Sequence, residues 1–315
     1  MSYSIPCLSP ATAKQLQSAY AVGWRQDWSV LKASGTDLRK YLQGQITQDM
    51  NKLSREQGIH ACILTPQGKA ISDLYMLEGN DDELLLLAPS AYAVPTVARL
   101  RQFALGYSLR IGVVDAWSIL EIQGAHATGE LQQAGFSVTE TGWLAATHAG
   151  DIHAIMMSEK PCCFWLIGDT SQLETITHSD LLDRNKAEAL RIIHGIPRFG
   201  TDWNEKIHPM NANMIEFDSV SFDKGCYVGQ EVTSRMHWRG GIKKRFYRVE
   251  LGNTPDGLPC PILITASIGM LTSAATDATG ACLGIAHLPI DVAESDTTLS
   301  LENGATVHII EACHA

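Results

Sequence analysis

The C-terminal part of the chain gives the strongest constraint on the fold. It consists of short apolar runs separated by Gly, Pro, Asn and Asp, and residues 249–315 contain acidic residues but no Lys or Arg. Short runs punctuated by turn residues are typical of strands in a small antiparallel barrel or sandwich. The runs are FYRVEL, PILIT, IGMLTSAA, CLGIAHL, TTLSL and TVHIIEA. We therefore predict a C-terminal β-barrel that begins near residue 245.

The region upstream alternates strand and helix patterns. The expected elements are strands at 28–35, 58–65, 69–77, 83–89 and 107–115, with helices at 36–50 and 93–105. Thr36 stands where an N-cap would, and Leu38, Tyr41, Leu42 and Ile46 form the apolar stripe of the first helix. This pattern predicts an α+β module with local hairpins.

A similar order of elements follows from Trp117. Here we expect strands at 117–124, 142–149, 151–158 and 163–169, and helices at 127–135, 171–178 and 185–195. The fold class is thus predicted as α+β, with two related modules at 1–116 and 117–244 and the barrel at 245–315. Residues 196–219 lack a sustained period, but Phe199 and Trp203 indicate an ordered loop.

Composition limits the classes of function. The chain has 315 residues, is 45% hydrophobic and carries a formal net charge of -10, which argues against nucleic-acid binding over its whole surface. No apolar run approaches the roughly 18 residues that span a bilayer, and the start lacks the pattern of a secretory signal, so we expect a cytoplasmic protein. The eight cysteines lack framework spacing, which fits reduced thiols. There is no CxxC, HExxH or glycine-rich phosphate loop, so we expect no metal site.

The chemistry concentrates between Val220 and Arg248. Cys226 is framed there by Lys224, Gly225 and Gly229. If a helix starts just after Cys226, its first-turn amides and Lys224 would both favour the thiolate of a reactive cysteine. The alternative is a buried cysteine that packs as a small hydrophobe, which is our interpretation for the other seven cysteines.

The same stretch carries the densest positive charge of the chain. Gln230 and Glu231 either bind a polar ligand or are first-turn helix residues. The cations either form a solvated face or, with Trp238, Phe246 and Tyr247 between them, bind a flat anion or a partner. These cations are Arg235, Arg239, Lys243, Lys244, Arg245 and Arg248.

The octapeptide Lys224-Gly225-Cys226-Tyr227-Val228-Gly229-Gln230-Glu231 resembles the KGCYxGQE signature of the YgfZ-type folate-binding proteins, a family related to the glycine cleavage T-protein, an aminomethyltransferase. Three further segments are similar to the family's pattern. They are Leu42-Gln43-Gly44-Gln45-Ile46-Thr47-Gln48-Asp49, the stretch from Pro66-Gln67-Gly68-Lys69 to Asp73-Leu74, and Arg191 to Gly195-Ile196-Pro197.

This resemblance implies two α+β modules, a C-terminal barrel and a site for tetrahydrofolate or a one-carbon derivative. It also implies a role in the synthesis or repair of iron–sulfur clusters in client proteins, including tRNA-modifying enzymes, with Cys226 as the required residue. From the composition we expect no membrane partner and no direct nucleic-acid contact. The folate-binding residues implied are Lys224, Gly225, Tyr227, Gly229, Gln230, Glu231, Arg191, Arg235, Arg239 and Asp73.

The sequence departs from the T-protein where that enzyme carries acids. Ser72-Asp73 stands in place of an acidic doublet, and Ile193 stands where an acid faces the pterin. We therefore do not expect glycine cleavage activity. Two alternatives stay open beside the accessory role: a folate-dependent one-carbon transferase with Asp73 or Asp49 as its acid, and a folate-binding scaffold without chemistry.

Overall fold

The computed structural model describes residues 4–139, 141–176 and 182–314, and the chain in it clusters into two compact units. The sheet unit comprises Gln15–Leu182 and Asp218–Gln230. The barrel unit comprises the residues up to Lys14, Asp183–Phe217 and Glu231 to the C-terminus. Since the predicted division into three parts does not follow these limits, it stays a prediction.

The first sheet of the sheet unit is antiparallel, with the order β3-β4-β5-β2-β6. Its strands are β2 (Trp28–Ser34), β3 (Ile59–Leu64), β4 (Ala70–Glu78), β5 (Leu84–Pro89) and β6 (Arg110–Val113). The helices α2 (Leu38–Gln43) and α3 (Ser90–Gln102) and the 3-10 turn η1 (Met50–Lys52) belong to the same stretch of chain. All five predicted strands of this module are confirmed.

The second sheet has the order β1-β7-β10-β9-β8. Its strands are β1 (Ala21–Trp24), β7 (Trp117–Gln123), β8 (Ala146–Ala149), β9 (Ile152–Glu159) and β10 (Cys162–Asp169), accompanied by α4 (Ala127–Gln133), α5 (Thr170–Leu173) and η2 (Glu174–Ile176). The two sheets share one topology, with β1 in the place that β6 takes in the first sheet. The end of the predicted helix at 171–178 lies outside the described residues.

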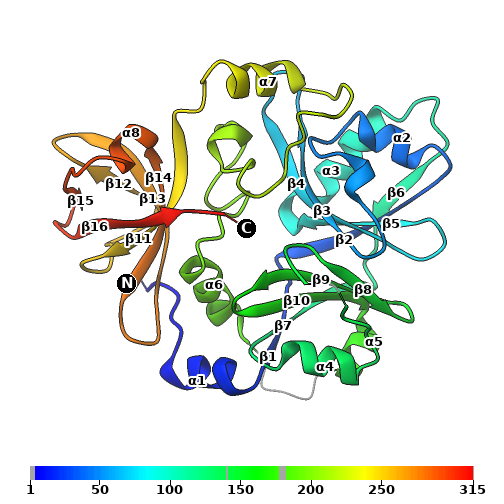
Figure 1. Ribbon diagram of the computed structural model, residues 1–315, viewed down its shortest axis with the longest axis horizontal. Coiled ribbons are helices and arrows are strands. Elements are labelled where there is room, and N and C mark those ends of the chain that lie inside the picture. Colours follow the sequence, from blue (N-terminus) through cyan, green and yellow to red (C-terminus); the bar gives the residue numbers. More distant parts are fainter. Residues whose placement is uncertain (1–3, 140, 177–181, 315) are drawn as a thin grey trace. The chain divides into compact units, whose positions relative to one another are not determined.

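The sheet unit has four layers (Figure 1). One face of the first sheet packs on α2 and α3 through a core that includes Leu42, Leu74 and Leu100. Its other face shares a core with the second sheet, where Trp28, Tyr75 and Trp165 meet. The far face of the second sheet is covered by α4 and α5. Strands that are buried on both faces explain the nearly continuous apolar runs in β3 and β5.

The barrel unit contains a closed barrel with the order β11-β14-β13-β12-β15-β16. Its strands are β11 (Lys244–Leu251), β12 (Cys260–Leu263), β13 (Ser267–Thr276), β14 (Cys282–Pro289), β15 (Leu299–Leu301) and β16 (Thr306–Ala312). The helix α6 (Arg184–Ile193) packs against β13 and β14, and η3 (Pro209–Asn211) and α8 (Ile290–Ala293) complete the unit. Each of the six predicted runs forms one strand, so the predicted barrel is confirmed.

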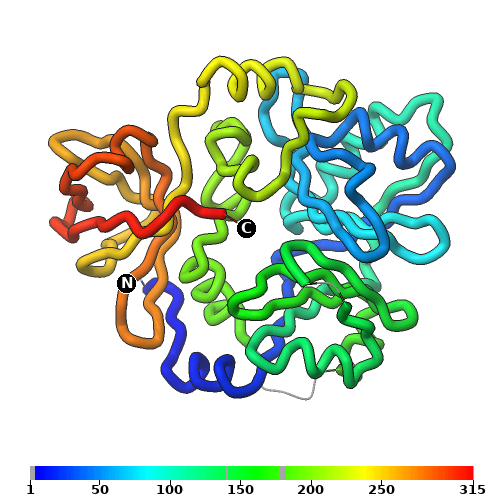
Figure 2. The backbone as a smooth tube through the Cα atoms, in the orientation of Figure 1, coloured from blue at the N-terminus to red at the C-terminus, as the bar shows by residue number. Residues whose placement is uncertain are grey.

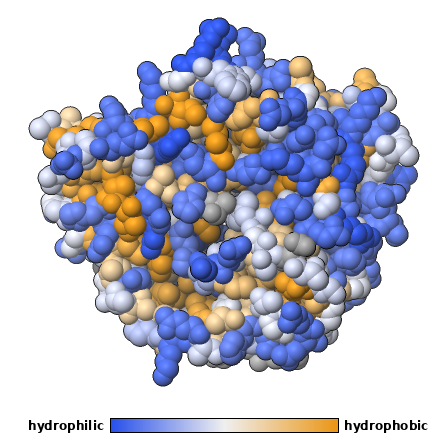
Figure 3. Space-filling view, in the orientation of Figure 1, coloured by the Kyte–Doolittle hydropathy of each residue, from blue (hydrophilic) through white to orange (hydrophobic). Residues whose placement is uncertain are grey.

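Two helices, α1 (Pro10–Ser18) and α7 (Gln230–Trp238), contribute residues to both units. The loop after α6 is ordered as predicted, because Phe199 and Trp203 are buried and their rings make an edge contact at 4.8 Å. No helix of the described residues is long and apolar enough to cross a membrane. Figure 3 shows one face of the molecule on which hydrophilic residues predominate and hydrophobic residues form smaller patches.

One predicted helix is wrong in length. The helix expected at 36–50 covers only Leu38–Gln43, and Asp37 rather than Thr36 is its N-cap. Ile46 instead bridges to Ile63, and the Thr47 N–H donates to the Cys62 carbonyl at 3.0 Å. The chain leaves the helix at Gly44 because these residues continue along the edge of β3, where Ile46 is still buried in the core.

Candidate functional site

The motif around Cys226 lies on the segment 42–49 within the sheet unit. The Lys224 Nζ donates to the carbonyls of Ile46 and Gln48, at 2.8 and 2.7 Å, and the Val228 N–H donates to the Gly44 carbonyl at 3.1 Å. In Figure 2 the yellow-green tube of this segment runs beside the blue and cyan part of the chain. Two of the segments that carry the resemblance are thus in contact although about 180 residues separate them.

The residues just before the motif are also tied to the first sheet. The Thr47 hydroxyl donates to the Ser219 carbonyl at 2.6 Å, and the Ser221 N–H donates to the Thr47 carbonyl at 3.0 Å. Lys52 forms an ion pair with Asp218 at 2.9 Å. The segment 218–230 is therefore held on the first module near its start, at residues 218–221, and again at Lys224 and Val228.

The two glycines of the motif have different roles. Gly229 has φ +86°, and a Cβ added there would lie 2.6 Å from the Thr65 carbonyl oxygen, so only glycine allows this approach to the β3–β4 hairpin. A Cβ at Gly225 would meet no heavy atom within 4 Å. The first glycine next to the cysteine therefore leaves open space, whereas the second seats the backbone on the hairpin.

Lys224 is a partly buried cation. Burial lowers the pKa of Lys224 to about 8, and the nearby Asp49 carboxylate opposes this shift. The Asp49 pKa is lowered, chiefly because its carboxylate accepts from the Asn51 N–H. The Lys224 ammonium also lies 5.1 Å from the centre of the Tyr227 ring. The positive charge is therefore held between the motif and the segment 42–49.

Cys226 is exposed, so it is not a core cysteine. The helix α7 begins at Gln230, and the Gln230 Oε1 accepts from the Tyr227 N–H at 3.2 Å. The predicted placement of the thiol at the start of a helix is therefore wrong, because the turn 227–229 separates the two. The thiol lies instead on the surface of a segment fixed by Lys224 and Gly229.

A buried polar cluster occupies the face of the first sheet opposite α2 and α3. The Asp73 Oδ2 lies 3.3 Å from the His60 Nε2, and the His60 Nδ1 lies 2.5 Å from the Ser219 Oγ. The His60 ring stacks on Tyr75 at 4.4 Å. Asp73 is 4% exposed, and its Oδ1 has no hydrogen-bond partner among the described residues. A buried carboxylate oxygen without a partner is costly unless a ligand uses it.

Sequence reasoning missed His60 and Ser219. The available signal was a histidine in the apolar strand β3. Its side chain lies on the face opposite that of Ala61 and on the same face as that of Cys62. Asp73 is the register partner of Cys62, and burial with the Asp73 charge raises the Cys62 pKa well above its ordinary value. Nothing in the sequence near Ser219 indicates a histidine partner, because His60 lies 159 positions away.

The remaining predicted residues lie in the barrel unit. Glu231, Arg235 and Arg239 are exposed, and Arg235 pairs with Glu231 at 3.1 Å, as neighbours one helical turn apart do. Further along, Arg245 pairs with Glu216 and Arg248 with Glu311. Half of the cations in this run are therefore neutralised locally.

The expected aromatic stacking beside these cations is corrected in part. Phe246 is 0% and Tyr247 7% exposed, since both belong to the barrel strand β11. Their rings are therefore unavailable to a ligand on the surface. Trp238, which is 73% exposed, retains that possibility.

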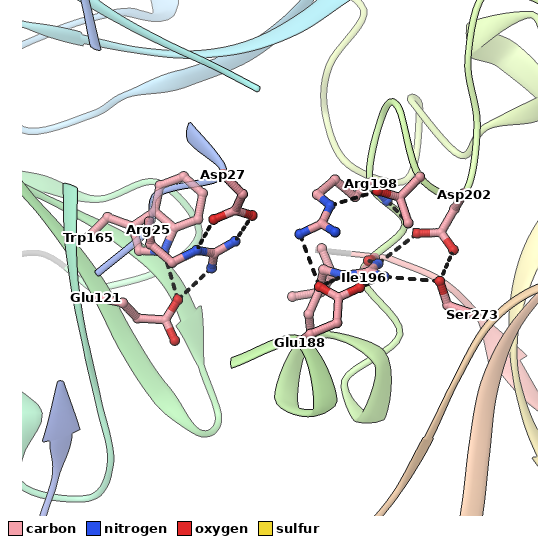
Figure 4. Close-up of polar contacts among 11 residues, drawn as sticks. Arg25, Asp27, Glu121, Trp165, Glu188, Ile196, Arg198, Asp202 and Ser273 are labelled. Atoms are coloured by element: carbon pink, nitrogen blue, oxygen red, sulfur yellow. Dashed lines mark hydrogen bonds and ion pairs between the residues drawn. The ribbon is translucent and has the colours of Figure 1, made fainter. Parts of the chain in front are cut away.

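Arg191 has several hydrogen-bond partners in the barrel unit, and Figure 4 labels Glu188, Ile196, Asp202 and Ser273 among them. Its Nε and Nη2 donate to the two Glu188 oxygens and Nη2 also to the Ser273 Oγ, while Nη1 donates to Asp202 at 2.7 Å and to the Ile196 carbonyl. All five N–H groups of the guanidinium are thus used. These contacts give Arg191 a structural role, and its predicted folate contact stays a prediction.

Figure 4 also shows a second buried arginine, in the sheet unit. Arg25 pairs with Asp27 at 2.9 Å and with Glu121 at 2.6 Å, and Glu121 also accepts from the Trp165 indole N–H. Arg25 directly follows β1 and Glu121 lies in β7, so the network links two neighbouring strands within the second sheet. It has no link to the Cys226 motif among the contacts described.

The two positions that depart from the T-protein are both buried. The Ser72 hydroxyl donates to the Asp73 carbonyl at 3.0 Å, and Ile193 is 8% exposed at the end of α6. Neither side chain supplies a carboxylate. Among the positions discussed, Asp73 is thus the buried acid of the sheet unit that has an oxygen left for a ligand.

Comparison with known proteins supports this description. No protein-family model matches the chain. The tRNA-modifying protein YgfZ of Colwellia psychrerythraea is 25% identical over 236 residues, which cover 74% of this chain and 72% of that protein. The YgfZ of Yersinia enterocolitica is 27% identical over 227 residues (70% and 68%), and that of Hamiltonella defensa is 28% identical over 240 residues (73% and 70%).

A solved structure shows the same fold. The glycine cleavage system aminomethyltransferase T from Bartonella henselae superposes with a TM-score of 0.81 at 14% sequence identity, covering 99% of this chain and 97% of that one. The resemblance predicted from the KGCYVGQE segment is thereby confirmed: this chain is related in sequence to the YgfZ proteins and has the fold of the glycine cleavage aminomethyltransferase.

Proposed function

We propose that this protein is a tetrahydrofolate-binding accessory protein of the cytoplasm that supports iron–sulfur cluster synthesis or repair in selected enzymes, including tRNA-modifying ones, through Cys226. The relatives named tRNA-modifying protein YgfZ support the link to tRNA modification. The observation that carries the proposal is the arrangement in the sheet unit. One segment, 218–230, holds both the exposed thiol and the serine that contacts the buried His60–Asp73 pair.

The residues of this unit fit a folate. A reduced pterin presents N–H donors on one ring edge, and the Asp73 Oδ1 is a buried acceptor without a partner among the described residues. His60 would orient that carboxylate through Oδ2, and Ser219 would hold the imidazole by its other nitrogen. The folate, when bound, would carry a one-carbon unit. Lys224, Gly225, Tyr227, Gly229 and Gln230 would fix the path of the chain beside it.

The exposed residues after the motif are proposed to contact the folate tail or a client protein. Glu231, Arg235 and Arg239 are exposed and would serve the glutamate tail of the folate or the surface of a client protein. Of these, Arg239 has no ion pair among the described residues, so its charge is the more available to an anion. Cys226 would contact the client, because it is the exposed thiol of the motif.

The experiment is complementation of a strain that lacks this protein. We expect Cys226→Ala to fail to restore the activities of iron–sulfur enzymes and the nucleosides that iron–sulfur enzymes modify in tRNA, measured by mass spectrometry. Cys7→Ala is the matched control, since Cys7 is also an exposed free thiol, and it should restore both. Titration of both variants with tetrahydrofolate should give the wild-type affinity. Full rescue by Cys226→Ala would sink the proposal.

One observation favours a second candidate, a folate-dependent one-carbon transferase. The Asp73–His60 pair could hold a proton close to a bound folate, whereas Asp49 is kept ionised by its hydrogen bonds. This candidate predicts methylene-tetrahydrofolate formation from an aminomethyl donor. The assay is decisive when it is run on protein already shown to bind tetrahydrofolate, because a negative result then removes the transferase and leaves the accessory role.

A further inference from the structure

The first sheet ends in a strand that has one open edge. β6 is the last strand in the order and pairs only with β2 among the described strands. The Val114 N–H donates to the Val30 carbonyl, and in an antiparallel ladder every second residue faces the partner strand. Ile111 and Val113 therefore turn their N–H and C=O groups away from β2, toward the edge.

Two arginines lie along this edge without an acidic partner in the described chain. The Arg101 Nε and Nη2 both donate to the outward Ile111 carbonyl, at 2.9 and 2.5 Å, so Arg101 covers that acceptor and the outward N–H and C=O of Val113 stay available on the edge. Arg110 is exposed in the same strand. A third cation, Lys32, is partly neutralised because it pairs with Glu83 and lies over the Trp117 ring.

A groove of about 850 Å³ follows the edge. Arg101, Arg110 and Val113 line it together with Leu105 and Leu109, and no Asp or Glu does. A cationic groove is an exception in a chain whose formal net charge is -10. Its charge therefore complements a negatively charged occupant.

Exposed apolar side chains concentrate in the stretch of chain that holds α3 and the loop after it, and one of them, Leu105, lines the groove. Of the seven exposed large hydrophobic residues of the described chain, four lie between residues 94 and 107. They are Val94, Phe103, Leu105 and Tyr107, of which Leu105 is 94% exposed. Such a concentration next to charged residues is typical of an interaction site.

We propose that this edge binds an extended segment of a partner protein that alternates acidic and apolar residues. The backbone of the segment pairs with Val113 as an added strand. Its acids meet Arg101 and Arg110, and its apolar residues cover Leu105 and Leu109, which line the groove. The proposal is independent of folate binding. The competing interpretation is that the arginines only protect the edge from unwanted pairing, as charged residues on edge strands do.

The test uses a fluorescein-labelled peptide of alternating Glu and Val residues, with a Lys and Val peptide as the charge control. Fluorescence anisotropy should show binding of the first peptide to the full-length protein and none of the second. Arg110→Glu, which reverses one charge, and Val113→Pro, which removes an N–H that faces away from β2, should each weaken binding at least about tenfold. Ile264→Asp changes an exposed residue that follows β12 in the barrel unit, and it should leave peptide binding unchanged.

Hydrogen exchange provides the second measurement. Bound peptide should protect the amides of Ile111 and Val113 and leave those of the barrel unit unchanged. Binding that weakens in Arg110→Glu but stays at full strength in Val113→Pro overturns strand addition, since charge alone then holds the peptide. Absence of binding by the Glu and Val peptide to the wild type overturns the proposal and leaves edge protection as the role of the arginines.

Discussion

Asp73 and His60 form a buried pair in which one carboxylate oxygen is used and the other is not. The Oδ2 lies 3.3 Å from the His60 Nε2, while the Oδ1 has no partner among the described residues. Neighbouring strands supply the two residues, so the pair is as rigid as the sheet itself. A site built on strands holds its polar groups more firmly than one built on loops.

Asp73→Asn should separate binding from stability. The amide can still accept from His60, but it then presents its NH2 group where the carboxylate offered an acceptor. We expect tetrahydrofolate to bind about 10–100-fold more weakly, the loss of one charge-assisted hydrogen bond. Isothermal titration gives the affinity. The free energy of unfolding should change by less than ~1 kcal/mol, because a buried carboxylate oxygen without a partner is also removed.

The control for this variant is Asp115→Asn, an exposed aspartate of the same unit. It should alter neither quantity. Wild-type affinity in Asp73→Asn would show that the carboxylate does not contact the ligand.

Gly229→Ala should destabilise the protein, whereas Gly225→Ala should not. Gly229 has φ +86° and leaves no room for a Cβ beside the Thr65 carbonyl, so its replacement combines backbone strain with a clash. We expect a loss of at least ~2 kcal/mol in the free energy of unfolding, measured in urea. Gly225 borders open space, so Gly225→Ala should change the free energy of unfolding by no more than about 0.5 kcal/mol. Equal effects would mean that the motif does not pack on the hairpin.

The sequence predicts those parts of the fold that depend on local pattern. The barrel strands are separated by turn residues, so each apolar run predicts its own strand without knowledge of its partner. β1 was missed because it has only four residues and because its partner strand lies about 100 positions later, as in the pair Val22 and Ile122. The helix from Thr36 was predicted too long, since nothing local shows that Ile46 bridges to Ile63.

The candidate site shows the same division. Its motif residues could be chosen from the sequence because they are contiguous. The contacts of Lys224 with the Ile46 and Gln48 carbonyls, and of Ser219 with His60, join distant segments, so no local pattern contains them. The resemblance to the family assigned Arg191 to the folate, and no local pattern reveals its partners, because Asp202 and Ser273 come from a loop and a barrel strand.

Lys224 should make stability depend on pH above neutrality. Burial lowers its pKa in the folded protein to about 8, whereas an unfolded lysine titrates near 10.4. Between these values the unfolded state binds more protons, so the contribution of Lys224 to folding rises with pH and is smallest below pH 8. We expect the unfolding free energy of the wild type, minus that of Lys224→Met, to increase by ~1 kcal/mol from pH 8 to pH 10. This value allows for the exposed part of the side chain.

The measurement is a set of urea denaturation curves of both proteins across this range. Lys206→Met, a change at an exposed lysine, is the control and should give a difference that does not vary with pH. If the wild-type value minus the variant value instead decreases as the pH rises, the lowered pKa of Lys224 is contradicted, because the folded-state pKa would then lie above that of the unfolded chain.

Arg191→Met should destabilise the barrel unit without affecting the proposed folate site. The guanidinium contacts Glu188, Asp202 and Ser273, and the Asp202 side chain is 0% exposed, so removal of the cation leaves a buried carboxylate without its ion-pair partner. Loss of one partner of a buried pair costs about 3–5 kcal/mol. Urea denaturation should show this loss, while Arg239→Met, at an exposed arginine, should show almost none. Tetrahydrofolate titrated into the folded Arg191→Met protein should bind with wild-type affinity, since every N–H group of Arg191 is already used inside the chain; a tenfold loss of affinity at unchanged stability would instead restore the arginine to the ligand.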